Sequence, residues 1–352
     1  MSLEVLGFTY DDLVARFEIA YGKGDFHAGE LFRRVYDTGS GDMTVSEAYR
    51  PNPALARQVT EDFSFSLPEI SRWMEEAGVV KFTLRFDDGA VCDAVIIPMD
   101  HYNTLCVSSQ SGCARGCAFC ETAARGFTRN LSTAEIVSQV MTAVFHFQAP
   151  ISNLVFMGMG EPMDNFDAVL RAVSILSDQR GLGIPKRKIT ISTCGHVEGI
   201  RRLSALAAEV NDRAFHTLRL AVSLNAPDDD TRSVLMPINR VWNMAALKEA
   251  LVSFPLHHRK DCLFIEYVLI PEVNDGPGAV EKLAAYLKGL VCQVNLIPWN
   301  PGSSGRFRKP RREEIEAFFF NLTSRGIPCR LRDTRGERIG AACGMLDGLP
   351  AK

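Results

Sequence analysis

Short apolar runs and amphipathic segments alternate along most of this 352-residue chain. The apolar runs are rich in β-branched residues, and the amphipathic segments repeat their apolar positions at a helical spacing. The pattern predicts β-strands at 104–109, 153–160, 188–193, 218–224, 261–270, 292–298 and 328–334. It predicts helices at 130–147, 166–176, 196–207, 244–254, 279–290 and 312–326. The first of these helices should be capped at Ser132, because Ser132 and Glu135 have capping-box spacing.

The number of β/α units predicts the fold class. Strict β/α alternation with right-handed crossovers builds a parallel sheet covered by helices. Six or seven units are fewer than the eight that close a complete barrel. We therefore expect an α/β protein with a partial (βα)6-type barrel over residues 101–346.

The first 100 residues have a different pattern. Residues 1 to about 65 show short helical patterns with glycine stops. Two β-rich runs then flank Asp87, Asp88 and Gly89, which is a hairpin signal. We expect a small N-terminal module of helices and a β-hairpin over residues 1–100.

The composition, with 46% apolar and 23% charged residues, is typical of a globular protein. No apolar run approaches the roughly 20 residues that span a bilayer, and the N-terminus does not resemble a secretory signal. We expect a cytoplasmic protein with no membrane partner. Because the net charge is −3, any RNA would have to be held by local basic patches, at 185–188, 306–312, Arg125 and Arg129.

Three cysteines have the spacing C-x3-C-x2-C, at Cys113, Cys117 and Cys120. A structural zinc site usually takes four ligands in two pairs, and no second pair lies downstream. A 4Fe–4S cluster normally takes four thiolates, so these three would leave one iron open to a small molecule. That iron could hold S-adenosylmethionine (SAM) through its amino and carboxylate groups. Zinc, or three unrelated buried thiols, are the alternatives.

Polar and glycine-rich residues follow several predicted strands. They lie at 158–162, 192–195, 223–225 and 295–301. Ligand sites of β/α barrels lie at the carboxyl ends of the strands. These segments and the cysteine loop should therefore meet at one rim, in a site with room for a large ligand.

The cysteine spacing, with Phe119 directly before the last cysteine, resembles the signature of the radical SAM superfamily. A longer series of segments resembles the RlmN/Cfr family of radical SAM RNA adenine methyltransferases: LCVSSQSGCARGCAFC, NLVFMGMGEPMDN, KITISTCG, LMPINR, IEYVLIPEVND, VNLIPWNPG and TRGERIGAACGML. The resemblance covers about residues 80–346. It is closer to the RlmN branch, which methylates adenine C2, than to the Cfr branch, which methylates C8.

This resemblance implies a reaction with two SAM molecules. Cys343 would first accept a methyl group from one SAM. The second SAM, cleaved at the cluster on Cys113, Cys117 and Cys120, would give the radical that activates this methyl group for addition to adenine. Cys106 would then release the methylated RNA by forming a disulfide with Cys343.

The resemblance also implies binding residues and partners. Asp93 would accept a proton, and SAM would be bound by Gly160, Glu161, Ser192, Ser223, Leu224, Asn225 and Asn300. The substrate would be ribosomal RNA, with tRNA in some members. From their positive charge, Arg33, Arg34 and the 306–312 loop are our candidates for contact with the RNA backbone. A flavodoxin- or ferredoxin-type protein would donate the electron, and we expect a monomer.

Some positions depart from the family pattern. They include Glu121 in place of Ala, Cys194 in place of Ser, Asn225 in place of His and Asp93 in place of Glu. Three other hypotheses therefore stay open: C8 methylation, a diverged paralogue with another substrate, and a non-catalytic iron–sulfur protein that binds RNA.

Overall fold

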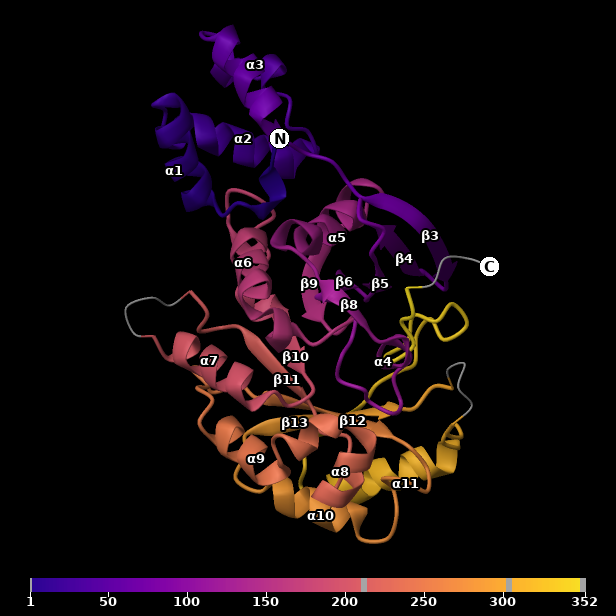
Figure 1. Ribbon diagram of the computed structural model, residues 1–352. Helices are drawn as coiled ribbons and strands as arrows, with labels where there is room; N and C mark the ends of the chain where they lie inside the picture. The colour runs from indigo at the N-terminus through magenta and orange to yellow at the C-terminus, as the bar shows by residue number, and fades with distance from the viewer. Residues whose placement is uncertain (1, 210–213, 302–305, 349–352) are drawn as a thin grey trace.

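A computed structural model describes residues 2–209, 214–301 and 306–348 (Figure 1). Its described part contains a ten-stranded sheet in the order β14-β13-β12-β11-β10-β9-β6-β5-β4-β3. The parallel strands are β6 (Asn103–Cys106), β9 (Ile151–Phe156), β10 (Ile189–Thr193), β11 (Arg219–Ser223), β12 (Leu263–Leu269), β13 (Cys292–Pro298) and β14 (Cys329–Leu331).

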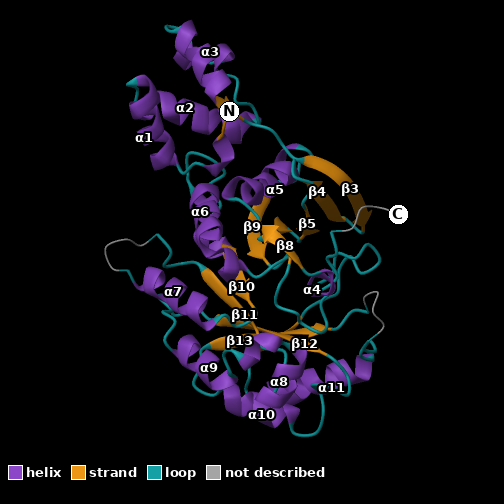
Figure 2. Ribbon diagram, viewed as in Figure 1, coloured by secondary structure: helices purple, strands orange, loops and turns teal. Residues whose placement is uncertain are grey.

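Helices follow the parallel strands, as predicted, and cover the outer face of the sheet (Figure 2). They are α5 (Thr133–Phe145), α6 (Phe166–Ser177), α7 (Val197–Ala208), α8 (Asp229–Leu235), α9 (Met244–Val252), α10 (Ala279–Leu287) and α11 (Arg312–Thr323). The capping box of Ser132 and Glu135 is present at the start of α5. The α/β fold class and the partial barrel are confirmed, whereas the short helix α8 was not predicted.

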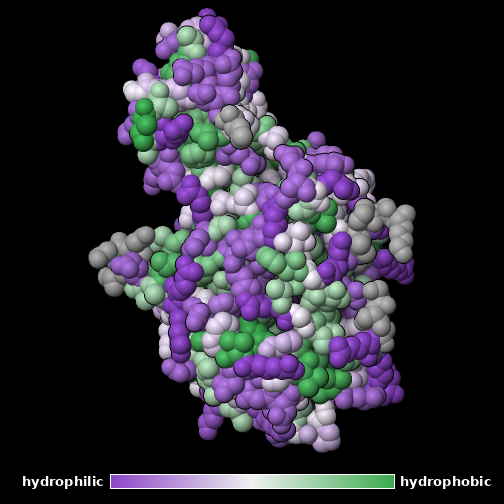
Figure 3. All heavy atoms as spheres, viewed as in Figure 1, coloured by the Kyte–Doolittle hydropathy of each residue, from purple (hydrophilic) through white to green (hydrophobic). Residues whose placement is uncertain are grey.

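The N-terminal helices form a lobe that projects from the barrel (Figures 1 and 3). They are α1 (Tyr10–Tyr21), α2 (Asp25–Thr38) and α3 (Pro53–Asp62), with a short parallel pair, β1 (Leu3–Glu4) and β2 (Phe63–Ser64). Tyr10, Phe17 and Phe32 are buried between them. Short 3-10 helices lie at Val5–Gly7, Met43–Val45, Glu47–Tyr49, Pro162–Asn165, Lys186–Lys188 and Pro237–Arg240.

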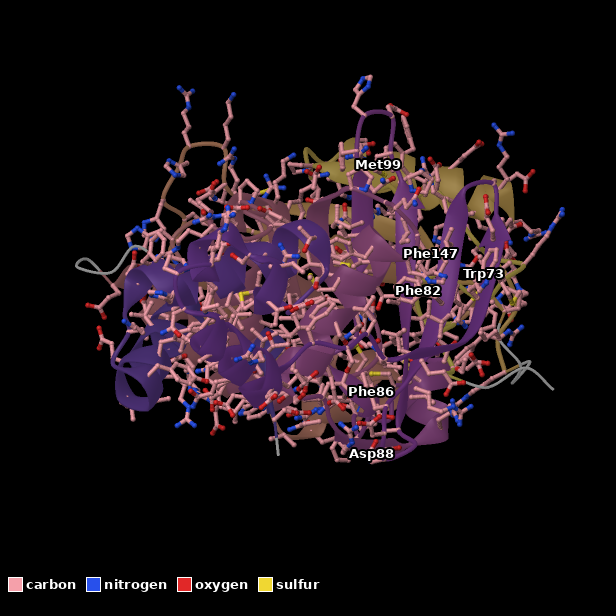
Figure 4. All side chains as sticks on the ribbon, turned by 90° about the horizontal axis from the view of Figure 1, so that it is seen from above. Trp73, Phe82, Phe86, Asp88, Met99 and Phe147 are labelled. Carbon is pink, nitrogen blue, oxygen red and sulfur yellow. The ribbon has the colours of Figure 1, made fainter. Side chains whose placement is uncertain are left out.

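The predicted hairpin is present as β4 (Val79–Arg85) and β5 (Val91–Pro98), and β3 (Glu69–Glu76) extends it. Strand β5 also pairs antiparallel with β6, so the proposed boundary at residue 100 falls within a continuous sheet. Trp73 and Phe82 of this antiparallel part contact Phe147, which follows α5 (Figure 4). The division into two domains stays a prediction.

Alternation along the parallel strands separates two environments. Ile191, Leu220, Val222 and Ile265 are buried in the apolar core. Their neighbours on the strands, including Ser192, Ser223 and Glu266, line cavities inside the barrel. Since consecutive strand residues point to opposite faces, the same strands supply both the core and a polar interior.

The cysteine loop is held by a small substructure made of β7 (Gln110–Gly112), α4 (Glu121–Arg125) and β8 (Phe127–Asn130). Strands β7 and β8 pair antiparallel, and Cys113 donates its backbone N–H to Gly126 O at 3.0 Å. Gly112 has φ +78°, and a Cβ there would lie 2.0 Å from Gly126 O. Only glycine fits this close approach of the two backbones.

Candidate active site

The three cysteines of the loop line a cavity at the carboxyl ends of the parallel strands, which we call the upper cavity. All three are partly buried. Burial and the nearby Cys120 raise the pKa of Cys113, to about 11, and the same causes raise the pKa of Cys117. Neutral thiols are therefore favoured in the protein alone, and a bound cation is needed to hold them as thiolates.

This donor set fits an iron–sulfur cluster. Cys113, Cys117 and Cys120 interact electrostatically with one another, face a shared cavity and belong to one short loop. Within the described ranges, no group of three His, Cys, Asp or Glu side chains is arranged to hold a single metal ion. Thiolates are the usual ligands of iron–sulfur clusters.

Gly160 and Glu161 lie beside the cysteine loop. Gly160 has φ +98°, and a Cβ there would lie 2.5 Å from Gln110 Cβ, so glycine is required. Glu161 is buried, and its carboxylate accepts the backbone N–H groups of Met163 at 3.1 Å and Cys194 at 2.7 Å. Because a carboxylate has about four acceptor positions, Glu161 can still accept hydrogen bonds from a ligand amino group in the upper cavity.

Ser192, Ser223 and Asn225 also line the upper cavity. Asn225 has φ +56° and accepts the backbone N–H of Val268 at 2.8 Å, which ties the end of β11 to β12. The side chain of Leu224 is fully buried and does not line this cavity.

Asn300 follows β13 and is buried next to Trp299, which lines the upper cavity. Its Oδ1 atom has no hydrogen-bond partner within the described part of the chain. Asn300 itself lines neither cavity. Buried polar atoms are normally paired, so its unpaired acceptor indicates a missing donor. A ligand such as SAM could supply that donor.

Cys343 lies between two cavities. It lines the upper cavity and also a second one, which we call the lower cavity and which contains Cys106. The side chain of Cys343 is exposed at these cavities, and desolvation by the surrounding protein and, next, the negative charge of Glu266 raise the pKa of its thiol. Burial, followed by the charge of Cys343, raises the pKa of Cys106. The structure therefore brings together the two cysteines predicted to form a disulfide, and both are free thiols.

The segment that carries Cys343 is anchored to the cysteine loop and to the hairpin. Glu121 donates its backbone N–H to Gly344 O at 2.8 Å, and Thr122 Oγ1 donates to Leu346 O at 2.6 Å. At the other end, Asp93 accepts the backbone N–H groups of Asp347 and Gly348.

Asp93 is completely buried and lines neither cavity. Thr83 Oγ1 donates to it at 2.6 Å, and Lys81 Nζ forms an ion pair with it at 3.2 Å. These contacts give Asp93 a structural role in holding the C-terminal segment. Its role as a proton acceptor stays a prediction.

Arg232 joins the carboxyl ends of β10 and β11, and the sequence did not predict this role. It lies on α8 and is 0% exposed. Its guanidinium donates to the backbone oxygens of Cys194 at 2.7 Å, Ser223 at 3.2 Å and Leu224 at 3.2 Å, and to Asn239 Oδ1 at 2.9 Å. The only local signal was its place shortly before the LMPINR segment.

Glu266 is a second missed residue. It is buried on β12, lines both cavities and accepts a hydrogen bond from Asn295 Nδ2 at 2.7 Å. Burial raises its pKa, while the bond from Asn295 and the charge of Arg332 act in the opposite direction. The apolar surroundings in IEYVLI predicted a strand but gave no sign that its one acid faces the reactive thiol.

Comparisons with known proteins identify the family of this chain. The radical SAM superfamily model matches residues 107–284. A probable dual-specificity RNA methyltransferase RlmN 1 of Protochlamydia amoebophila is 39% identical over 99% of this chain and 95% of its own length. A dual-specificity RNA methyltransferase RlmN of Syntrophobacter fumaroxidans is 40% identical over 92% of each chain. The crystal structure of a radical SAM methyltransferase from Sphaerobacter thermophilus matches with TM-score 0.88 and 36% identity, over 99% of this chain and all of that one.

The chain belongs to the RlmN/Cfr family of radical SAM enzymes. The superfamily model includes the cysteine loop, Glu161, Ser192, Ser223 and Asn225, but not Asp93, Cys106, Asn300 or Cys343. RlmN relatives match nearly the whole chain, so the RlmN/Cfr assignment also covers the hairpin and the C-terminal segment. In the described part of the chain, no helix is both long enough and apolar enough to cross a bilayer.

Proposed function

We propose that this enzyme methylates C2 of an adenine in 23S ribosomal RNA, with tRNA as a second substrate. The names of its RNA-methylating relatives support the substrate class, and the placement of Cys343 supports the chemistry. The observation that carries the proposal is that one thiol lines both cavities. A group that must meet SAM and then RNA needs such a position.

Cys113, Cys117 and Cys120 would hold a 4Fe–4S cluster, and Glu161, Ser192 and Ser223 would bind SAM beside it. When bound and reduced by a flavodoxin- or ferredoxin-type protein, the cluster supplies the electron for reductive cleavage of SAM. The buried carboxylate of Glu161 suits a ligand ammonium group, and the two hydroxyl groups suit ribose or carboxylate oxygens.

Cys343 would act first as a nucleophile. Its thiol loses a proton, a bond forms between its sulfur and the methyl carbon of SAM, and the bond from that carbon to the SAM sulfonium breaks. Because the pKa of Cys343 is raised, this step needs a nearby proton acceptor, and Glu266 is an acid that lines the same cavities.

Cys106 would act last. After the methyl carbon has bonded to adenine, Cys343 is still joined to the RNA. Attack of the Cys106 thiolate on the Cys343 sulfur would form the disulfide bond and break the bond from that sulfur to the methylene carbon, which keeps the electron pair and takes up a proton as the methyl group of the released base. Both thiols line the lower cavity, which supports their close approach.

Anaerobic assay of the reconstituted protein with SAM, a reductant and unmodified ribosomal RNA tests the proposal. We expect 2-methyladenosine in the nucleoside digest, and none from Cys343→Ala, which should also lack a methylated cysteine. A peak of 8-methyladenosine would assign the protein to C8 chemistry instead. SAM cleavage without any RNA product would indicate another substrate, and absence of SAM cleavage would favour a non-catalytic iron–sulfur protein.

A further inference from the structure

The lower cavity opens at the amino ends of the parallel strands, opposite to the cysteine loop. Its walls include residues at or just before the starts of β6, β10, β11 and β12. Met99, on the connection from β5 to β6, also lines it, and Figure 4 shows Met99 and Asp88 at opposite edges of the molecule. Asp88 lies at the turn of the hairpin and pairs with Arg129, next to the β7–β8 substructure. The two cavities therefore reach Cys343 from different ends of the barrel.

The lower cavity is rich in positive charge. Its lining includes five cations, from four different segments: Lys188, Arg219, Lys260, Arg330 and Arg332. None of the five forms an ion pair with an acid in the described residues. Glu266, the acid in its wall, accepts a hydrogen bond from Asn295, and among the five cations Arg332 interacts with its charge. Lys188 is partly buried and the other four are exposed, so they surround the opening of the cavity, where unpaired cations are available to an anionic ligand.

Of the basic patches predicted from the sequence, the one at 185–188 contributes Lys188 to the lower cavity, whereas acids neutralise much of the charge of the 306–312 loop and of Arg129. In the 306–312 loop, Arg308 pairs with Glu272 and Glu314, Lys309 with Glu337, Arg311 with Glu314 and Arg312 with Glu316. Arg129 pairs with Asp88 and Glu135. In a chain with net charge −3, the lower cavity thus concentrates cations that remain available to bind phosphate.

The cavity also offers access to the reactive thiol. Met157, Glu266, Cys343 and Leu346 line both cavities and form the wall between them. Tyr102 is 38% exposed at the lower cavity, with Lys188 Nζ 5.2 Å from the centre of its ring. Exposed aromatic rings beside cations are typical of surfaces that stack bases of single-stranded nucleic acid.

We propose that the target nucleotide enters the barrel through the lower cavity, a proposal that rests on the RNA methyltransferase function proposed above. The five cations bind phosphates of an unpaired RNA segment, Tyr102 stacks on a flanking base, and the extruded adenine reaches Cys343 from below. SAM reaches the same sulfur from the upper cavity. The two substrates therefore do not compete for one entrance.

Salt-dependent binding of a ribosomal RNA fragment that the wild-type enzyme methylates provides the test. The double variant K188Q/R330Q should weaken binding about ten-fold and reduce the salt slope by about 1.4, at about 0.7 per phosphate contact on single-stranded RNA. The matched control R308Q/R311Q removes the same formal charge from ion-paired positions and should keep the wild-type affinity and slope. Thermal unfolding and the methylation state of Cys343 report whether each variant is folded.

A second measurement uses only the wild-type protein. Ultraviolet crosslinking to the same fragment containing 4-thiouridine, followed by peptide mass spectrometry, should identify peptides that include Tyr102 or residues 329–332. Wild-type affinity in K188Q/R330Q, or crosslinks confined to the 306–312 loop, would overturn the proposal. A wild-type protein that neither binds nor methylates RNA would overturn the proposed function as well, whereas an active wild type with unaffected cavity variants would overturn this inference alone.

Discussion

Gly348 donates its backbone N–H to Oδ2 of Asp93 at 2.8 Å, across 255 positions of the chain. Asp347 adds a second N–H to the same oxygen at 3.2 Å. Because Asp93 is fully buried in the sheet, these bonds fix one end of the segment that carries Cys343. The position of the reactive thiol therefore depends on the antiparallel hairpin as well as on the barrel.

Replacing Asp93 should disturb both stability and the first methyl transfer. Asp93→Ala leaves Lys81 without one of its two acidic partners and removes two anchors of the C-terminal segment. We expect a loss of about 3 kcal/mol of folding free energy, which is typical of a broken buried ion pair. Chemical unfolding and mass spectrometry of Cys343 methylation measure the two effects. Asp88→Ala, at the exposed turn of the same hairpin, should change neither by much.

Removing Cys106 should trap the enzyme on its substrate. Cys106→Ala keeps Cys343 and the cysteine loop but cannot form the disulfide that releases RNA. We expect a covalent protein–RNA adduct, seen as a slow band on a denaturing gel that ribonuclease shifts back. Cys92→Ala removes another buried thiol, on β5, and should show no adduct. Normal turnover by Cys106→Ala would contradict the disulfide step.

Arg232 should control SAM binding without touching SAM. Arg232→Met removes donors to the carbonyl groups of Cys194, Ser223 and Leu224 and leaves these oxygens unpaired. We expect a stability loss on the order of 3 kcal/mol and a weaker affinity for SAM, measured by calorimetry. Arg240→Met, at an exposed position after α8, should bind SAM normally. Unchanged SAM affinity in a folded Arg232→Met protein would show that the strand ends keep their arrangement without it.

The alkylation of Cys343 should depend on pH in a way that reports its surroundings. Its pKa is raised above 9.0, so the thiolate fraction should rise about ten-fold per pH unit and still be rising at pH 9.0. Glu266→Gln removes a negative charge that raises this pKa, so the profile should shift to lower pH. Arg332→Gln removes a positive charge and should shift it to higher pH. Iodoacetamide labelling with peptide mass spectrometry measures both shifts. A shift to higher pH in Glu266→Gln, or to lower pH in Arg332→Gln, would contradict the arrangement.

The sequence was sufficient for the order of strands and helices because each element carries its own local signal. In the capping box at Ser132, in the turn at Asp87–Gly89 and in each apolar run, the residues that give the signal lie within a few positions of one another. Strand β3 was missed because its sequence, EISRWMEE, is largely polar and its inner residues pack against neighbours that only the fold supplies. The short strands around the cysteine loop have no pattern long enough to detect.

The functional surfaces were harder to predict, because the acids that neutralise a basic side chain come from distant positions in the sequence. Only the fold shows which basic side chains have such a partner. The 306–312 run is the most basic segment of the sequence, yet its partners come from positions 272, 314, 316 and 337. The cations of the lower cavity are spread over positions 188–332 and meet only because their strands are neighbours. Arg232 and Glu266 were missed for the same reason.

The bonds from Glu121 to Gly344 and from Thr122 to Leu346 join the loop of the cluster ligands to the segment of the nucleophile. Disorder in one of these two pieces would spread to the other. On the function proposed above, loss of iron would therefore displace Cys343 as well as prevent electron transfer. A protein without its cluster would then not use SAM for methylation.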